Sequence, residues 1–390
     1  MKKKVVSIIL AGALITGVLS GCGSGNSKNV PASTEKAGVT AEEGTANAEE
    51  ETADDLVAEN AADEDSWETV TLRARAANNA ISHIDSVVAK NAGLYEDAGL
   101  DVELSYNPSN PENIQALLAD QADLVGAGSA AVLNYIDQGA DIVIIGGQMS
   151  LGETLYAQAE RAEEFTELSE ETLAGKKIGV SRMNTGDIVF RKILLNRGVD
   201  LSKIEFVELD SQATVTEAVI KGEVDLGINF LTYRETAEAQ GLIPISQLDA
   251  EDEWPDYICC RLFTTRDKLE ANREAYVRAL KANIKAYELI QTDQEATLKA
   301  AQEAYSIEEE ILTNELYGYG HLGLSPNPDV LNTSEYYQAM VDIGYSEGNV
   351  DIKDYIDATL YIEALDELLA EDPDNEIYLA LKAESDATNY

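Results

Sequence analysis

The segment KKIGVSRMNTGDIVFRKILLNRG, residues 176–198, places a short apolar strand directly before a helix. We expect the strand over residues 176–181 and the helix over residues 186–198. Thr185 is placed as the N-cap, with Gly186 and Asp187 in the first helical turn. In open α/β sheets, ligands bind beyond the carboxyl ends of the strands, which is where this turn would lie. The segment therefore predicts both an α/β fold and a candidate ligand site.

Strands and helices alternate on both sides of this segment, in two units. Before it, strands are expected over residues 70–78, 101–106, 122–128 and 141–148. After it, strands are expected over residues 203–209, 224–230 and 242–248. Beyond Thr265 the pattern is almost entirely helical. Short apolar strands that alternate with helices are typical of mostly parallel sheets covered by helices on both faces.

The composition is strongly acidic, with 72 Asp and Glu residues against 28 Lys and Arg residues. Binding of nucleic acid needs a basic surface, so this charge argues against a nucleic-acid partner. It favours a soluble protein that faces outward from the cell. The chain has two histidines and three cysteines, which offer no zinc-like ligand set, so we expect no metal and no cofactor.

The first residues have the pattern of a lipoprotein signal peptide. Three lysines, residues 2–4, precede an apolar stretch over residues 5–18 that is short for a membrane span. The tetrapeptide LSGC, residues 19–22, then gives an apolar residue and two small residues before a cysteine. We expect residues 1–21 to be removed and Cys22 to carry lipid, including palmitate, which anchors the protein on the extracytoplasmic face of the cell membrane. An ordinary signal peptide with a chance cysteine and an uncleaved anchor helix are the alternatives.

Residues 22–67 contain almost no large apolar side chain and consist mainly of small, polar and acidic residues. Such a composition cannot bury enough apolar surface to offset the entropy of ordering the chain. We therefore expect a disordered acidic tether between the lipid anchor and a folded head.

A first strand with a polar end and five segments after it, one of which contains the segment quoted above, match one known family in order and spacing. The five segments are VVAKNAGLYEDAGLDVEL (87–104), ADLVGAGSAAVLNYIDQGADIVIIGG (122–147), LAGKKIGVSRMNTGDIVFRKILLNRGVD (173–200), IKGEVDLGINF (220–230) and YICCRLFTTRDKLEANREAYVRALKANIKAYE (257–288). Over residues 70–305 the chain resembles the substrate-binding lipoproteins of ABC importers, in the family that binds nitrate, sulfonates, taurine and thiamine-pyrimidine precursors.

The resemblance implies a periplasmic-binding-protein-like, type II (Venus-flytrap) fold. This is an α/β fold with two lobes, each a mostly parallel sheet flanked by helices, joined by two hinge crossings. Lobe 1 would comprise residues 68–157, completed by a return strand and C-terminal helices over residues 258–390. Lobe 2 would comprise residues 158–257, with ligand in the cleft between the lobes.

The expected ligand-binding residues lie at the carboxyl ends of predicted strands or in the turns that follow them. They are Asn78, Asn79, His83, Ser129, Gln148, Met149, Ser181, Arg182, Asn184, Thr185, Gly186, Asp187, Asn229 and Tyr233. Free N–H groups in the turn at Thr185 can hold a ligand acceptor, and Ser129 is the expected cap of the equivalent turn in lobe 1. Each position also has a plainer interpretation, as a helix cap, a surface residue or a core residue without ligand contact.

Two adjacent cysteines, Cys259 and Cys260, lie on the strand that returns from lobe 2. Members of the resembled family often carry a vicinal pair there. Buried thiols beside the hinge are the plainer interpretation, and a redox or metal role is the alternative.

The resemblance implies a monomer without catalytic activity that captures a small molecule and delivers it to the permease and ATPase subunits of an ABC importer. The sequence contains no Gly-x-Ser-x-Gly elbow and no phosphate-binding loop. One alternative is an enzyme of the thiamine-pyrimidine synthase type, for which His83 and Lys90 are the plausible pair beside pyridoxal phosphate and iron. Another is a surface sensor or adhesin with the same fold.

The ligand class is suggested by Asp187. A carboxylate in this turn would repel anions and favour amino or ring N–H donors, with Arg182 as the nearby compensation. We therefore expect a pyrimidine or another amine-bearing compound before a sulfonate, taurine or nitrate.

Overall fold

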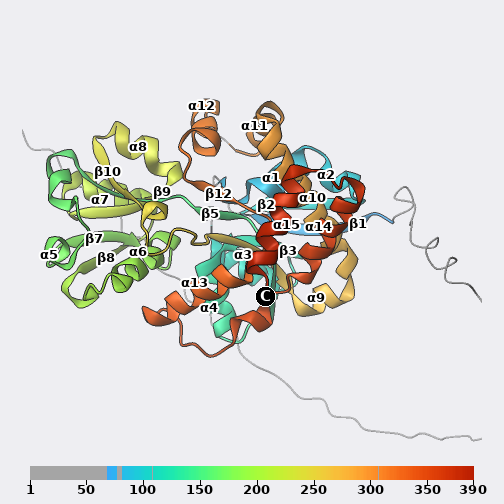
Figure 1. The fold of residues 1–390 in the computed structure, drawn as a ribbon, viewed down its shortest axis with the longest axis horizontal. Coiled ribbons are helices and arrows are strands. Elements are labelled where there is room, and N and C mark those ends of the chain that lie inside the picture. Colours follow the sequence, from blue (N-terminus) through green and yellow to red (C-terminus); the bar gives the residue numbers. More distant parts are fainter. Residues whose placement is uncertain (1–67, 77–80, 108, 306) are drawn as a thin grey trace, which may run out of the picture. The chain divides into compact units, whose positions relative to one another are not determined.

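The computed structural model describes residues 68–76, 81–107, 109–305 and 307–390. The predicted signal peptide and tether, with Cys22, lie outside the described residues, as do Asn78 and Asn79. The described residues form two five-stranded sheets and one two-stranded sheet, accompanied by helices (Figure 1). The prediction of an α/β fold with two helix-flanked sheets is confirmed.

The first sheet has the strand order β2-β1-β3-β11-β4. Its strands are β1 (Val70–Ala76), β2 (Leu100–Tyr106), β3 (Leu124–Gly128), β4 (Ile142–Gly147) and β11 (Cys260–Thr265). β1 is parallel to β2 and β3, whereas β11 is antiparallel to both β3 and β4. Because β11 lies between β3 and β4, the chain returns from the second sheet to complete the centre of the first.

The second sheet has the strand order β10-β6-β9-β7-β8. Its strands are β6 (Glu153–Gln158), β7 (Lys177–Ser181), β8 (Glu205–Leu209), β9 (Leu226–Phe230) and β10 (Leu242–Gln247). β7 is parallel to β8 and β9, whereas β6 is antiparallel to β9 and β10. The carboxyl ends of β7, β8 and β9 therefore share one edge of the sheet.

The strand β6 was not predicted. The boundary suggested by the sequence leaves residues 153–157 in the first lobe, but the structure pairs them with β9 and β10 of the second sheet. The first five residues of β6 are all buried, so the strand has no alternation of buried and exposed positions. The crossing lies earlier, at β5 (Met149–Leu151), which pairs with β12 (Leu322–Leu324).

Helices flank both sheets (Figure 1). Those that precede β11 are α1 (Ile84–Asn91), α2 (Leu94–Asp97), α3 (Asn110–Leu118), α4 (Ser129–Asp137), α5 (Glu170–Leu173), α6 (Thr185–Asn196), α7 (Gln212–Lys221) and α8 (Arg234–Ala239). Those that follow it are α9 (Arg266–Ala271), α10 (Arg273–Thr292), α11 (Gln294–Gln302), α12 (Glu309–Thr313), α13 (Val330–Asp342), α14 (Thr359–Glu371) and α15 (Glu376–Thr388). α10 packs against α1 and α14, and α13 contacts both α4 and α6.

A continuous apolar cluster joins the two sheets. It includes Val125 of β3 and Leu155 of β6, both fully buried, together with Tyr336 and Met340 of α13. A second cluster packs α1, α10 and α14 with the first sheet. Since burial of apolar surface is the dominant favourable term in folding, α13 stabilises the contact between the two sheets.

Two predicted helix caps are wrong by one residue. Asn184 is the N-cap of α6: its backbone is extended (φ −83°, ψ 158°) and its Oδ1 accepts the Thr185 N–H at 2.8 Å. Thr185 is already the first helical residue. Likewise α4 begins at Ser129, so Gly128 is its N-cap and no side chain caps it. An N-cap needs a non-helical backbone, which the sequence pattern did not locate to a single residue.

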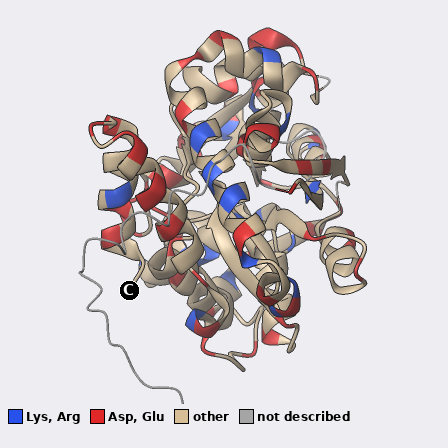
Figure 2. Ribbon diagram, turned by 90° about the vertical axis from the view of Figure 1, so that its right-hand side faces the viewer, with Lys and Arg blue, Asp and Glu red and all other residues tan. Residues whose placement is uncertain are grey.

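Acidic positions are spread over the described helices, with fewer basic positions among them (Figure 2). Within the described ranges, no helix combines the length and the apolar character that a membrane span requires.

Candidate functional site

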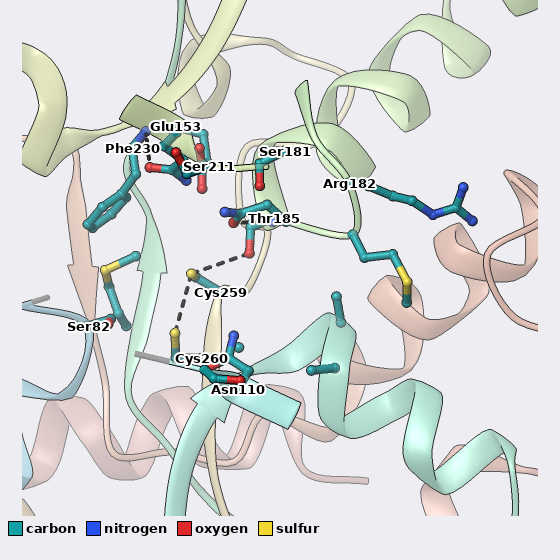
Figure 3. Close-up of a pocket in the computed structure, with 18 of the residues that line it drawn as sticks. Ser82, Asn110, Glu153, Ser181, Arg182, Thr185, Ser211, Phe230, Cys259 and Cys260 are labelled. Carbon is teal, nitrogen blue, oxygen red and sulfur yellow. Dashed lines mark hydrogen bonds between the residues drawn. The ribbon is translucent and has the colours of Figure 1, made fainter. Parts of the chain in front are cut away.

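A cavity of about 770 Å³ lies between residues of the two sheets and the turns at their edges (Figure 3). From the first sheet and its turns it is lined by Ser82, His83, Ser109, Asn110, Pro111, Gly128, Ala130, Ala131, Asn134, Tyr135, Cys259 and Cys260. From the crossing and the second sheet it is lined by Met149, Glu153, Ser181, Arg182, Met183, Asn184, Thr185, Asp210, Ser211, Gln212, Phe230, Thr232 and Tyr233. Both apolar and polar groups converge on it, as in small-molecule sites.

The first turn of α6 meets the two thiols at the wall of this cavity. Thr185 Oγ1 donates to Cys259 Sγ at 3.3 Å, and the Cys259 and Cys260 sulfurs are 3.4 Å apart (Figure 3). Both cysteines are free and buried. The hydrogen bond with Cys260, together with burial, raises the pKa of Cys259 well above its usual value. The thiol of Cys259 is therefore protonated at neutral pH and a weak nucleophile.

Glu153, the first residue of β6, brings a buried carboxyl to the same wall. Gly152 precedes it with φ +91°, a left-handed conformation that suits glycine and turns the chain from β5 into β6. The Glu153 side chain is 1% exposed, and its Oε2 accepts no hydrogen bond from any described residue. Burial raises the pKa of Glu153 well above 4.5, and the Cys259 side chain raises it further. The Gly186 N–H lies near the carboxyl and partly opposes the shift, although it does not reach hydrogen-bond geometry with Oε2.

His83 lines the cavity from the side of the first sheet. Its Nδ1 lies 2.7 Å from Gln148 Oε1, and Gln148 Nε2 donates to Asp85 Oδ1 at 3.1 Å and to Ser86 Oγ at 3.2 Å. With the amide oriented in this way, Nδ1 carries the proton and Nε2 is left as an acceptor. Burial lowers the pKa of His83 to about 4, so the ring is neutral at neutral pH.

Asp187 does not line the cavity, although the sequence suggested that it would face the ligand. Its side chain is buried and paired: Arg191 Nε donates to Oδ1 at 2.6 Å, and Tyr345 Oη donates to Oδ2 at 2.6 Å. The Met183 N–H also donates to Oδ2, at 3.3 Å. The reasoning that Asp187 repels anionic ligands is therefore wrong, because this carboxylate is neutralised by partners outside the cavity.

Arg182 lines the cavity with part of its side chain, but its charge is directed elsewhere. Its Nη1 donates to Glu208 at 3.0 Å, and its guanidinium lies 4.8 Å from the centre of the Tyr345 ring. Figure 3 shows this side chain extending away from the two thiols.

Of the predicted ligand residues, seven line the cavity and five described ones do not. Those that line it are His83, Met149, Ser181, Arg182, Asn184, Thr185 and Tyr233. Those that lie behind the lining are Ser129, Gln148, Gly186, Asp187 and Asn229. The Ser129 N–H is bonded to Cys259 O at 2.8 Å, and the Asn229 amide lies 2.6 Å from Thr216 Oγ1. Contact of any of these residues with a ligand stays a prediction.

Several lining residues were missed by the sequence reasoning, above all Glu153. Ser109 and Ser211 are N-caps of α3 and α7, the helices that follow β2 and β8. In the sequence analysis, polar residues that follow the carboxyl end of a strand are expected to face the ligand. The same rule, applied to the ends of β2 and β8, would have found these two turns. Glu153 carried no such signal, because β6 itself was not predicted.

The described residues contain no group of three or more His, Cys, Asp or Glu side chains arranged to hold a metal ion. Lys90, named with His83 in the enzymatic alternative, does not line the cavity and forms an ion pair with Glu96 on the surface.

Solved structures with the same fold include several ligand-binding proteins. The periplasmic aliphatic sulphonate binding protein of Escherichia coli is 18% identical, with a TM-score of 0.63 over 76% of this chain and 100% of that one. The ligand binding component of an ABC-type import system from Staphylococcus aureus, with zinc bound, is 14% identical, with a TM-score of 0.62 over 75% of this chain and 98% of that one. The periplasmic nitrate-binding protein of Synechocystis PCC 6803 is 13% identical, with a TM-score of 0.62 over 77% of this chain and 89% of that one. These likenesses establish the periplasmic-binding-protein fold.

Similar sequences include candidate binding proteins of Brucella abortus and Brucella suis. Each is 27% identical over 209 residues, which make up 53% of this chain and 62% of the relative. The match therefore spans less than two thirds of these relatives. The model of one family, described as NMT1/THI5 like, matches residues 80–297, which is more than half of the chain. On this match, the chain belongs to the NMT1/THI5-like family.

Proposed function

We propose that this protein is the extracytoplasmic solute-binding component of an ABC importer. It would capture a small molecule in the cavity and deliver it to permease and ATPase subunits. The observation that carries the proposal is the cavity itself, which is lined by strand ends and turns of both sheets. In α/β folds this edge is where ligands bind, and the similar solved structures are binding proteins.

The lining supports binding rather than reaction. Phe230, Tyr135 and Tyr233 offer flat apolar surface, and hydroxyl and amide groups of Ser109, Asn110 and Ser211 offer hydrogen bonds. Cys259 has a raised pKa, and His83 has one nitrogen committed to Gln148. These groups can hold and orient a ligand without chemistry.

For localisation, we propose that residues 1–21 are a signal peptide and that lipid on Cys22 anchors the protein outside the membrane. The acidic residues 22–67 would then tether the binding head near its permease. The support is the sequence pattern of lysines, apolar stretch and LSGC.

For the ligand, an amine-bearing compound such as a pyrimidine is the first proposal, and a sulfonate, taurine or nitrate is the second. Asp187 no longer supports the first, but Glu153 brings a carboxyl to the cavity where Asp187 does not.

A thermal-shift screen across these compounds tests the proposal. A ligand at 100 times its Kd stabilises the folded protein by about 2.7 kcal/mol, which is a clear shift of the midpoint. Ala131→Trp fills the cavity from α4 and should abolish the shift, whereas Ala370→Trp on the exposed face of α14 should leave it unchanged. Equal shifts in the two variants, or no shift with any compound, would contradict the proposal.

A further inference from the structure

The N terminus of α6 is already in contact with a carboxyl group of the chain itself. Gly186 is the second residue of α6, and a Cβ placed on it would lie 2.7 Å from Glu153 Oε2 and 3.1 Å from Glu153 Cδ. The Glu153 side chain therefore lies against the first helical turn, at the wall of the cavity. Figure 3 draws Glu153 and Thr185 at this wall.

This arrangement matters because a helix N terminus attracts negative charge. Its unbonded N–H groups and the helix dipole together make a favourable place for an anion. In this protein the place is taken by Glu153, so an anionic ligand would meet a like charge or a carboxyl that must stay protonated. Two negative groups at one buried site repel each other strongly.

The cavity lining carries little positive charge that could offset the repulsion between Glu153 and an anionic ligand. Among the described residues that line it, Arg182 is the only Lys or Arg, and its guanidinium pairs with Glu208. The titratable groups that interact with Glu153 are the side chains of Cys259, Tyr156, Tyr257 and Tyr336. None of these four carries a positive charge.

Building on the proposed function, we propose that Glu153 takes the place of an anion at the N terminus of α6. It thereby selects a ligand that presents N–H donors, such as a protonated amine or an amidinium. Its unpartnered Oε2 is the acceptor for such a donor. A ligand N–H would supply the hydrogen bond that this buried oxygen lacks, and a bidentate amidinium suits a carboxylate in particular.

The rest of the cavity lining fits the same ligand class. His83 is held neutral by Gln148 with Nε2 as an acceptor, so it adds no positive charge to the cavity. Phe230, Tyr135 and Tyr233 also line the cavity, and aromatic faces attract cations.

Two aromatic probes of similar size and opposite charge test the inference: benzamidinium and benzenesulfonate. Calorimetric titration and thermal shift of the wild-type protein should show at least tenfold tighter binding of benzamidinium. Glu153→Gln keeps the size of the side chain and removes the charge. It should weaken benzamidinium at least tenfold and strengthen benzenesulfonate, because the helix N terminus is then free of an anion.

Asp187→Asn is the matched control. It removes a buried carboxylate from the helical turn that Glu153 contacts, but the Asp187 carboxylate lies outside the cavity. The ratio of the two affinities should therefore stay within about twofold of wild type. Thermal denaturation establishes that each variant is folded, and the wild-type comparison of the two probes does not depend on either variant.

The outcomes separate this inference from the proposed function. Tighter binding of benzenesulfonate by the wild type, or an unchanged ratio in Glu153→Gln, would overturn the role of Glu153 and leave solute binding standing. Failure of both probes to bind would overturn the inference, while solute binding would still be decided by the thermal-shift screen. If Asp187→Asn changed the ratio of the two affinities as much as Glu153→Gln does, any negative charge near α6 would influence probe binding. That result would also overturn the inference, because Glu153 would then have no specific role.

Discussion

Two buried carboxyl groups lie beside the first turn of α6, and their surroundings are opposite. Asp187 is 2% exposed and accepts hydrogen bonds from Arg191, Tyr345 and the Met183 N–H. Glu153 is 1% exposed, and its Oε2 accepts none from the described residues. A satisfied carboxylate stabilises the fold, whereas an unsatisfied one at a cavity costs stability and is available to a ligand. Partners, and not proximity to the helix, therefore distinguish a structural carboxylate from a binding one.

The largest expected effect is on stability and comes from Asp187→Ala. This variant leaves the Arg191 guanidinium, which lies over the Phe206 ring at 3.6 Å, without its carboxylate partner. Breaking a buried ion pair from one side costs about 3 kcal/mol. Urea denaturation at pH 7 should show this loss in the free energy of unfolding, while Glu153→Ala should show none of comparable size. A loss below about 1 kcal/mol for Asp187→Ala would contradict the assignment of Asp187 as a structural group.

The next effect concerns pH and Glu153. Because burial raises the pKa of Glu153 above 4.5, the folded state holds this proton to a higher pH than the unfolded state does. The free energy of unfolding therefore falls as pH rises from about 4.5 through the folded-state pKa, by up to about 1.4 kcal/mol per pH unit. Glu153→Gln removes this contribution, so the variant should gain stability over wild type as pH rises, with no difference near pH 4.

Urea denaturation of wild type and Glu153→Gln between pH 4 and pH 8 measures this difference. All other titrating groups are shared by the two proteins, so they cancel in the comparison. Asp187→Asn serves as the control, since it should be less stable than wild type at neutral pH. A constant difference between wild type and Glu153→Gln across the range would mean that Glu153 has the same pKa in both states.

The sequence predicted the edge at which the cavity lies, but not which side chains face it. Parallel strands end at one edge, so His83, Ser181 and Tyr233 could be placed there from pattern alone. Whether Thr185 or Asp187 faces the cavity depends on the phase of a helix that turns by about 100° per residue. Side chains two residues apart, such as those of Thr185 and Asp187, leave the helix about 200° apart around its axis, and the sequence does not say which of them faces the cavity.

Glu153 lay beyond prediction for a different reason. Its strand β6 pairs with β9 and with β10, which are distant in the sequence, and it is buried on both faces. Neither feature leaves a local pattern. The fold class needed only local alternation of strands and helices, whereas the binding carboxyl depended on long-range pairing.

The smallest expected effect separates Asn184 from Thr185 at the start of the same helix. Asn184 caps α6 through Oδ1, so Asn184→Ala should lower the free energy of unfolding by about 1 kcal/mol. The Thr185 hydroxyl donates to Cys259 Sγ at 3.3 Å, where sulfur is a weak acceptor, and it accepts from Tyr336 Oη at 3.5 Å, which is a long hydrogen bond. Loss of the hydroxyl in Thr185→Ala should therefore lower the free energy of unfolding by only a few tenths of a kcal/mol, in addition to the cost of losing the methyl group. Thr185→Val keeps that methyl group, so it measures the contribution of the hydroxyl alone. Thermal denaturation of Asn184→Ala and Thr185→Val side by side measures the difference. A larger loss in Thr185→Val than in Asn184→Ala would contradict the assignment of Asn184 as the N-cap of α6 and would return that role to Thr185, as the sequence pattern predicts.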